Sequence, residues 1–389
     1  MKLEFHGHDE RYIVEQSMMS LFPLEKPVYG AVEPRETDWC RLTAEETAAG
    51  GRVSGELHYS GAAGAAETAY TLSGTAFEQE GQRRYAVAAC FYLAFLDLMK
   101  ALPEAARAAG KLVLPPWGML TGVRPDKPVT WALMEGKSPE EAKAYLKAHY
   151  FVPEERAALA LETGIVGYQA RKRLAARDID LYVGIPFCPT RCAYCSFVSQ
   201  SVERSFGLVE PYVQALLAEL RVGGEMVREN RLRPRTFYMG GGTPTTLSAG
   251  QLDAVLTALE ESFDLSDCPE LTVEAGRPDT ITREKLIAIR EGGGNRISVN
   301  PQTMSDPVLA AIGRSHRAQD IRRAYALARE TGVGAVNMDL IAGLPADTPA
   351  GFRRTVEEVL AMAPENITVH TLALKRSEER RVGKECRSR

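Results

Sequence analysis

The second half of the chain alternates short apolar segments with helical stretches, and this alternation restricts the fold more than any other feature of the sequence. The helical stretch 208–228 is the clearest, because its apolar residues recur at three- and four-residue spacing. Strands that alternate with helices form parallel βα units with right-handed crossovers. The pattern therefore predicts an α/β fold of six βα units, as an open parallel sheet or as a partial (βα)6 barrel. The strand candidates are residues 181–185, 236–239, 271–274, 296–300, 335–341 and 366–372.

Residues 1–174 have a different pattern and predict a smaller α+β domain of unknown role. Short alternating segments, such as 52–59 and 68–74, precede a long apolar run at 85–99, and a helical pattern begins at residue 139. The apolar run contains Asp97 and is shorter than the roughly 20 residues that a membrane-spanning helix needs. We therefore expect a buried helix there and no membrane span. The turn-rich stretch 117–125 is interpreted as a surface connector.

The two ends of the chain and its charge bear on location and partners. The first ten residues lack the basic-then-apolar order of a secretory signal, so we expect a cytoplasmic protein. The formal net charge of -4 provides no excess of positive charge for binding nucleic acid.

Residues 175–375 form the predicted core domain. Residues 376–389 are a basic stretch without periodicity, either a solvated tail or foreign sequence; we favour foreign sequence after a truncation, because no closing element follows the last strand.

Three of the seven cysteines lie within eight positions, as Cys188-Pro-Thr-Arg-Cys192-Ala-Tyr-Cys195. This C-x3-C-x2-C motif follows directly after the strand candidate 181–185. Three thiolates can hold three irons of a [4Fe-4S] cubane and leave the fourth iron open, unlike an electron-transfer cluster with four cysteines. An open iron can bind the amino and carboxylate groups of a methionine moiety. The motif therefore predicts a cluster that cleaves S-adenosylmethionine (SAM).

The three cysteines have two other interpretations, a zinc site and a set of structural thiols. A zinc site would need a fourth Cys or His nearby, but Ser196, Phe197 and Val198 follow the motif. Three structural cysteines in an exposed loop would be open to oxidation. Both interpretations are disfavoured relative to a cluster.

Polar and glycine residues follow the other strand candidates. Gly240, Gly241 and Gly242 come directly after one strand, where glycines allow close approach of the backbone to a polar ligand. Carboxylates suit a ribose diol, and an arginine suits a carboxylate through its planar donor fork. Because such residues meet at the carboxyl ends of parallel strands, together they favour a nucleoside-bearing ligand. The further polar residues are Glu274, Gln302, Arg314 and Asp339.

The segment Tyr182-Val-Gly-Ile-Pro-Phe-Cys188 through Cys195, with Gly240-Gly-Gly-Thr-Pro-Thr245, resembles the radical SAM superfamily. More narrowly, it is similar to the oxygen-independent coproporphyrinogen III oxidases. The N-terminal domain and the sequence Leu-Thr-Gly-Val-Arg-Pro at 120–125 look like those of HemZ-type coproporphyrinogen dehydrogenases.

The resemblance implies a cofactor set and site residues. Cys188, Cys192 and Cys195 would bind the [4Fe-4S] cluster. The remaining matched positions would contact SAM, with Ala373 at a position that contacts a second SAM in the oxidases. These SAM contacts are Tyr182, Tyr194, Gly241, Gly242, Thr243, Glu274, Gln302, Arg314, Asp339 and Ala373.

The implied reaction is the oxidative decarboxylation of two propionates of coproporphyrinogen III, which gives the vinyl groups of protoporphyrinogen IX. The cluster, reduced by a one-electron donor such as flavodoxin or ferredoxin, would split SAM into methionine and a 5'-deoxyadenosyl radical. That radical would abstract a β-hydrogen from a propionate, after which carbon dioxide and one electron leave. One SAM is consumed for each decarboxylation.

Three positions depart from the family pattern. Phe197 stands where the oxidases have a further cysteine, and it matches the related haem chaperones instead. Gly184 replaces a usual histidine, and Asn300-Pro301-Gln302 replaces a usual Gly-Val-Gln. Two alternatives to the oxidase therefore stay open: a haem-binding chaperone of the same superfamily, and a non-catalytic iron-sulfur or zinc module.

Overall fold

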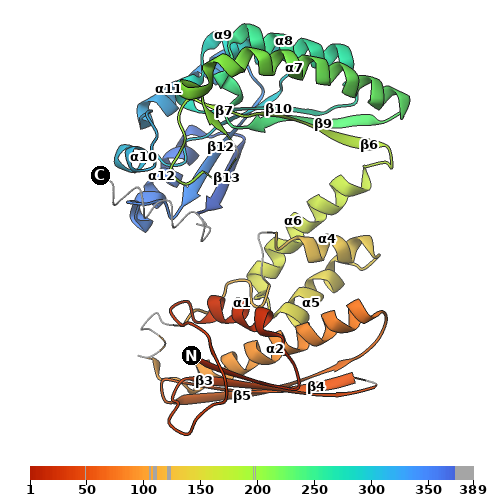
Figure 1. Cartoon of the computed structure of the whole chain (residues 1–389), viewed down its shortest axis with the longest axis vertical. Helices are drawn as coiled ribbons and strands as arrows, with labels where there is room; N and C mark the ends of the chain where they lie inside the picture. The colour runs from red at the N-terminus through yellow and green to blue at the C-terminus, as the bar shows by residue number, and fades with distance from the viewer. Residues whose placement is uncertain are drawn as a thin grey trace. The chain divides into compact units, whose positions relative to one another are not determined.

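A computed structural model describes residues 1–372, except 49, 105–106, 108–111, 121–123, 196 and 198 and the side chains of 203 and 204. Ala373 and the tail 376–389 thus lie outside the described residues, as does part of the stretch 117–125. The chain divides into two compact units, one spanning Met1–Leu174 and the other beginning at Ala175. Figure 1 shows the elements of each unit.

The first unit contains a five-stranded sheet in the order β2-β1-β3-β4-β5. Strand β1 is parallel to β2 and β3, while β3, β4 and β5 pair antiparallel. The strand that we placed at 68–74 begins earlier and ends earlier, because a tight turn at Ser60 and Gly61 starts β5 directly after β4. The bounds are β1 Lys2–His6, β2 Val28–Tyr29, β3 Trp39–Thr47, β4 Gly50–Tyr59 and β5 Ala62–Thr71.

Five helices complete the described part of the first unit. Helix α2 contains the apolar run and begins with a capping box, in which Thr75 and Glu78 satisfy each other's backbone N–H groups. Phe91 and Phe95 of α2 are fully buried in the core. Helices α4, α5 and α6 form a second, smaller core of their own. The bounds are α1 Arg11–Leu21, α2 Ala76–Ala101, α4 Lys127–Met134, α5 Pro139–Tyr150 and α6 Glu154–Lys172.

The second unit is built on a parallel sheet in the order β13-β12-β11-β10-β9-β6. The order in the sheet follows the order in the chain, so every crossover moves in the same direction. Right-handed crossovers then place all helices on one face, and the sheet curls around the other face. Figure 1 shows α7, α8 and α9 together on that outer face. Of the two forms that the sequence allowed, the fold is therefore the partial barrel and not an open, doubly wound sheet.

The six strands agree in position with the six strand candidates, with ends that differ by at most three residues. They are β6 Asp178–Ile185, β9 Arg233–Gly241, β10 Glu270–Gly276, β11 Arg296–Val299, β12 Ala335–Ala342 and β13 Asn366–Thr371. The covering helices are α7 Val202–Glu229, α8 Ala249–Ser262, α9 Arg283–Glu291, α10 Asp306–Ala311, α11 Ala318–Thr331 and α12 Pro349–Met362.

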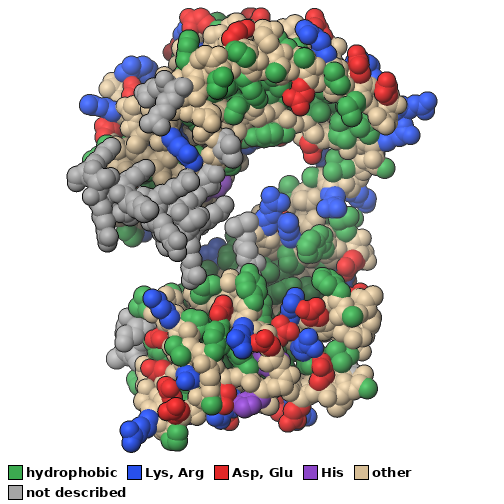
Figure 2. Space-filling model, viewed as in Figure 1, with side chains coloured by type: hydrophobic (Ala, Val, Ile, Leu, Met, Phe, Trp, Pro, Cys, Tyr) green, Lys and Arg blue, Asp and Glu red, His purple; other side chains and the backbone are tan. Residues whose placement is uncertain are grey.

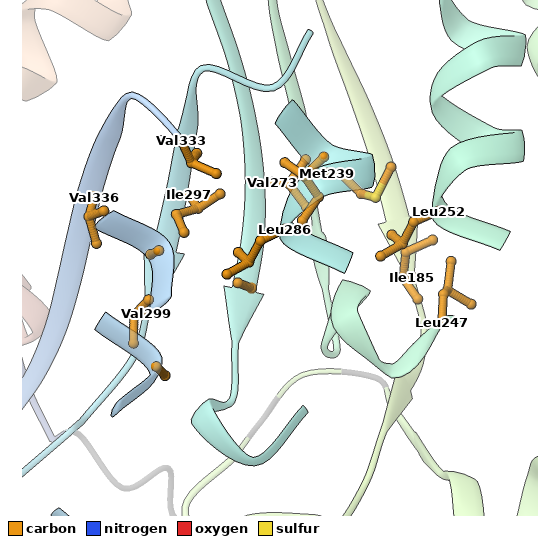
Figure 3. Close-up of a cluster of buried hydrophobic side chains, with 14 of the residues drawn as sticks. Ile185, Met239, Leu247, Leu252, Val273, Leu286, Ile297, Val299, Val333 and Val336 are labelled. Atoms are coloured by element: carbon orange, nitrogen blue, oxygen red, sulfur yellow. The ribbon is translucent and has the colours of Figure 1, made fainter. Parts of the chain in front are cut away.

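The core of this unit lies between the sheet and the helices. Figure 3 shows Ile185, Met239 and Val273 of three neighbouring strands packed with Leu252 and Leu286 of the helices. Successive side chains of a strand point to opposite faces. The residues between these buried ones therefore point to the inner, concave face, which is where the polar side chains gather.

Candidate functional site

The cysteine loop is closed at its base by two short strands that the sequence did not predict. After β6, strand β7 Phe187–Cys188 pairs in parallel with β8 Gln200–Ser201. Gln200 N donates to the Pro186 carbonyl over 2.7 Å, and Ala193 N donates to the Ile312 carbonyl over 3.1 Å. The loop is thus fastened at both its ends and its middle.

The three cysteines of the motif line one cavity of about 570 Å³ at the carboxyl ends of the strands. All three thiols are free and partly buried. Burial raises the pKa of Cys195, and the nearby thiols of Cys192 and Cys188 add to this rise against a lowering contact from the Phe197 N–H. The thiols are therefore close enough to interact electrostatically.

The donor set suits a cluster better than a single metal ion. In the part of the chain that the structure describes, no three Cys, His, Asp or Glu side chains converge as ligands of one ion. A zinc ion needs four converging ligands, whereas each thiolate of a cubane binds a different iron. Three thiols that share a cavity without converging on one point fit the second case.

The glycines at the end of β9 lie against the cysteine loop, backbone to backbone. Gly242 N donates to the Ile185 carbonyl over 2.7 Å, and Thr243 N donates to the Phe187 carbonyl over 2.8 Å. A Cβ on Gly242 would lie only 2.6 Å from the Phe187 oxygen. Gly241 has a φ of +102°, which L side chains rarely adopt. These glycines therefore pack two loops together, in addition to any contact with a ligand.

Glu274 on the inner face of β10 accepts a hydrogen bond from the Tyr238 hydroxyl over 2.5 Å. Burial raises the pKa of Glu274, the Tyr238 hydrogen bond lowers it, and the Asp339 carboxylate raises it again, with a net rise. Burial and then Glu274 raise the pKa of Tyr238, so that its hydroxyl stays a donor. Asp339 accepts a hydrogen bond from Asn337 Nδ2 over 2.7 Å.

Gln302 has a left-handed backbone conformation, which is unusual for a residue other than glycine. Its φ is +67°, and it forms an isolated parallel bridge with Leu340. Its N–H donates to the Asp339 carbonyl over 2.9 Å, and its carbonyl accepts from Ile341 N over 3.0 Å. Through these two hydrogen bonds, the chain after β11 pairs with β12 at Gln302. The Gln302 side chain lines the cavity.

Three buried polar atoms around the cavity have no hydrogen-bond partner among the described residues: Asn300 Oδ1, Gln302 Oε1 and Arg314 Nε. Such an unsatisfied group costs about 1–3 kcal/mol. The Arg314 guanidinium does reach the Tyr194 hydroxyl over 3.3 Å, but no described carboxylate lies within ion-pair distance of it. A polar ligand with a carboxylate and hydroxyl groups, as SAM has, would satisfy this set.

The structure brings most of the predicted site residues together around this cavity. Besides the three cysteines, the lining includes Tyr194, Gly241, Gly242, Thr243, Glu274, Gln302, Arg314 and Asp339. Tyr182 is not part of the lining: its ring is parallel to that of Tyr238 at 6.0 Å, and it is 63% exposed. Ala373 lies outside the described residues. The individual roles of all these residues stay predictions.

Several lining residues were not among the predicted site residues. Most of them share a period of two along their strands, and this signal could have found them once the core face of each strand was assigned. Arg277 is different, because it lies in the turn after β10 and carries no local signal. The residues are Tyr238, Arg277, Arg296, Ser298, Asn300, Asn337, Ile341, Thr368 and His370.

Comparison with known proteins agrees with this geometry. Residues 182–359 match the model of the Radical SAM superfamily. The oxygen-independent coproporphyrinogen-III oxidase-like protein HemZ of Bacillus subtilis is 40% identical over 272 residues, which are 68% of this chain and 53% of HemZ. The heme chaperone HemW of the same organism is 35% identical over 195 residues, 49% of each chain. The solved structure of Escherichia coli coproporphyrinogen III oxidase (HemN) matches with 29% identity and a TM-score of 0.47, over 54% of this chain and 47% of that one.

Residues 182–359 thus form a radical SAM domain, a class that uses a [4Fe-4S] cluster and SAM. Within this class, the chain is similar to the oxygen-independent coproporphyrinogen III oxidases and to HemZ and HemW. It spans about half the length of the curated relatives that it matches. No helix of the described residues is long and apolar enough to cross a membrane.

Proposed function

We propose that the chain catalyses the oxygen-independent oxidative decarboxylation of coproporphyrinogen III to protoporphyrinogen IX. The observation that carries this proposal is the cavity itself. It is lined by the three cysteines and by Asn300, Gln302 and Arg314, each of which has a buried polar atom without a hydrogen-bond partner among the described residues. The similarity of the chain to HemZ, an oxygen-independent coproporphyrinogen-III oxidase-like protein, supports the choice of substrate. The reducing electron would come from a donor such as flavodoxin or ferredoxin.

Bound together, the cluster and SAM would supply a 5'-deoxyadenosyl radical. Cys188, Cys192 and Cys195 would hold the cluster at one end of the cavity. The SAM carboxylate would lie against Arg314, whose guanidinium has no acidic partner among the described residues, and the ribose diol against Asp339. The inner sheet face, curled around the cavity, would keep water from the radical.

A substrate with several propionates needs cations at the mouth of the cavity. Arg191 lines the cavity between two of the cysteines and is exposed. No described carboxylate lies within ion-pair distance of it, so its planar donor fork is available for a substrate carboxylate. The Arg296 guanidinium lines the same cavity but already contacts Glu270 over 3.2 Å. Arg191 is therefore the better candidate for binding a propionate.

The decisive experiment is anaerobic reconstitution with iron and sulfide. We expect about four irons per chain, a reduced-cluster spectrum that SAM perturbs, and SAM-dependent formation of 5'-deoxyadenosine. Cys195→Ala should abolish all three, whereas the matched control Cys268→Ala should keep them, because Cys268 lies on the opposite end of the strands and is only partly buried. If Cys195→Ala retained the SAM-perturbed spectrum, the cluster assignment would be wrong. Product analysis with coproporphyrinogen III, SAM and a reductant then tests the substrate.

Phe197 favours a second function, a haem-binding chaperone. Its side chain is 67% exposed yet lines the cavity next to Cys195, where an aromatic face could stack on a flat macrocycle. The similarity to HemW is consistent with this role.

Haem titration separates the two functions. Stoichiometric haem binding without protoporphyrinogen formation, weakened by Phe197→Ala, would favour the chaperone. Formation of protoporphyrinogen by the parent chain, together with a Phe197→Ala variant that binds haem as the parent does, would favour the oxidase. Phe206→Ala is a suitable control, since Phe206 is 78% exposed but does not line the cavity.

A further inference from the structure

Arg277 is a buried cation in contact with the cysteine loop, in the turn between β10 and α9. It follows Gly276, whose φ of +57° turns the chain at the end of the strand. The Arg277 side chain is only 3% exposed. A buried guanidinium must have its donors satisfied, so its partners indicate what it does.

The hydrogen bonds of Arg277 link three segments that are far apart in the sequence. Its Nη1 donates to the carbonyl of Thr190 over 3.2 Å and to the Thr190 hydroxyl over 3.0 Å. Its Nε and Nη2 donate to the two carboxylate oxygens of Asp279 over 3.0 and 2.9 Å. Its Nη2 also donates to the Ser315 hydroxyl over 3.2 Å. Thr190 lies between Cys188 and Cys192, so the guanidinium binds the cysteine loop directly.

Asp279 keeps this cation neutralised. Burial raises the pKa of Asp279, but the contacts with His316 and Arg277 outweigh it and hold this pKa well below its usual range. The Ser315 hydroxyl donates to the same carboxylate over 3.1 Å, and His316 Nδ1 lies 3.5 Å from it. The pair Arg277–Asp279 is therefore a charged, geometrically fixed unit and not a flexible surface contact.

The turn after β10 and the start of α9 also form hydrogen bonds with Thr245, at the end of the glycine-rich segment 240–245. The Thr280 hydroxyl donates to the Arg277 carbonyl over 2.8 Å and lies 2.7 Å from the Thr245 hydroxyl. Lys285 Nζ donates to the Thr245 carbonyl over 2.5 Å and to the Thr280 carbonyl over 3.1 Å. The turn after β10 thus contacts both loops that would hold the cluster and SAM.

We propose that Arg277 is a positioning residue that, together with Asp279, holds the backbone at Thr190 so that the cysteine loop is ordered before a cluster is present. The proposal rests on the proposed role of Cys188, Cys192 and Cys195 as ligands. An arginine is required, because its planar fork binds the Asp279 carboxylate on one side and the Thr190 carbonyl and hydroxyl on the other. A lysine has the charge but cannot make both contacts at once.

Hydrogen exchange on the full, metal-free chain tests this role without using activity. In Arg277→Lys we expect the amides of residues 188–195 to exchange about tenfold faster than in the parent chain, because the loop opens more often. After anaerobic reconstitution, we expect a lower iron content and an altered spectrum of the reduced cluster. Arg283→Lys is the matched control, because Arg283 forms an exposed ion pair with Glu330, and it should match the parent in both measurements.

Thr190→Val gives an independent test that leaves the buried ion pair intact, should Arg277→Lys fail to fold. It removes the hydroxyl acceptor but not the carbonyl, and we expect exchange at 188–195 to rise about threefold. Parent-like exchange and cluster spectra in Thr190→Val, and in Arg277→Lys where it folds, would overturn the proposal. Because exchange is measured without cluster or substrate, a failure to decarboxylate coproporphyrinogen would leave this result unaffected.

Discussion

Replacing Gly242 by alanine should destabilise the second unit even when no cofactor is bound. A Cβ at this position would lie 2.6 Å from the Phe187 oxygen and 2.9 Å from the Ile185 oxygen, both closer than the 3.0 Å that real Cβ atoms keep. The Ile185 oxygen accepts the hydrogen bond of Gly242 itself over 2.7 Å. The two loops would have to separate, and the bonds that join them would lengthen.

The size of the effect follows from two opposing terms. Overpacking against backbone costs about 1–3 kcal/mol. An alanine also lowers the entropy of the unfolded chain, which returns about 0.4–1 kcal/mol. The net loss of about 1–2 kcal/mol should lower Tm by roughly 2–8 °C for a unit of this size. The matched control Gly250→Ala places its Cβ in open space within helix α8, and it should raise Tm by a few degrees.

Thermal unfolding of the metal-free chain can be followed with two spectroscopic probes that respond differently to the two units. All three tryptophans, Trp39, Trp117 and Trp131, lie in the first unit. Tryptophan fluorescence should therefore report an unchanged transition in Gly242→Ala, while circular dichroism at 222 nm shows the shifted transition of the second unit. If the metal-free variant unfolds at the parent temperature and only SAM binding is lost, Gly242 serves the ligand alone and the packing argument is wrong.

Two further predictions concern the sheet around the cavity. Glu274→Gln should stabilise the chain by about 1 kcal/mol at pH 7, because burial holds the pKa of Glu274 above its unfolded value and glutamine still accepts the Tyr238 hydrogen bond. In the parent, the folded state binds the extra proton, so stability falls as pH rises through the window above pH 4.5, and denaturant midpoints of the two chains should converge below it. Phe237→Ala should cost about 3–5 kcal/mol, because Phe237 is fully buried between the sheet and its helices; a loss under 1 kcal/mol in urea unfolding would contradict the described core.

The sequence predicted the framework of the second unit because its signals are local. Six apolar segments separated by amphipathic helices require parallel strands, and the cysteine spacing identified one loop. The choice between an open sheet and a partial barrel was beyond reach, because it depends on the order of strands in the sheet and not on their periodicity. In the first unit, β1 escaped prediction, since its partners β2 and β3 lie far along the chain and its own pattern is only five residues long.

Within the candidate site, too, only residues with a local sequence signal could be predicted. Glu274 and Asp339 could be found because they interrupt apolar strands with a charge at the carboxyl end. Gln302 could be placed near them, but its positive φ comes from a bridge to β12 that no local pattern predicts. Arg277 could not be found at all, because its partner Thr190 is 87 positions away and the contact exists only after the strands have assembled.

The two kinds of residue around the cavity therefore differ in what a substitution would do. A residue found from a motif, such as Cys192, lines the cavity, so its loss should mainly affect cofactor binding. A residue found only in the structure, such as Arg277, joins two segments through backbone groups, so its loss should affect the metal-free chain as well. Measuring stability and loop exchange without cofactor separates these two classes. Because Gly242 is both a motif residue and a packing residue, it is the position at which this distinction is tested most directly.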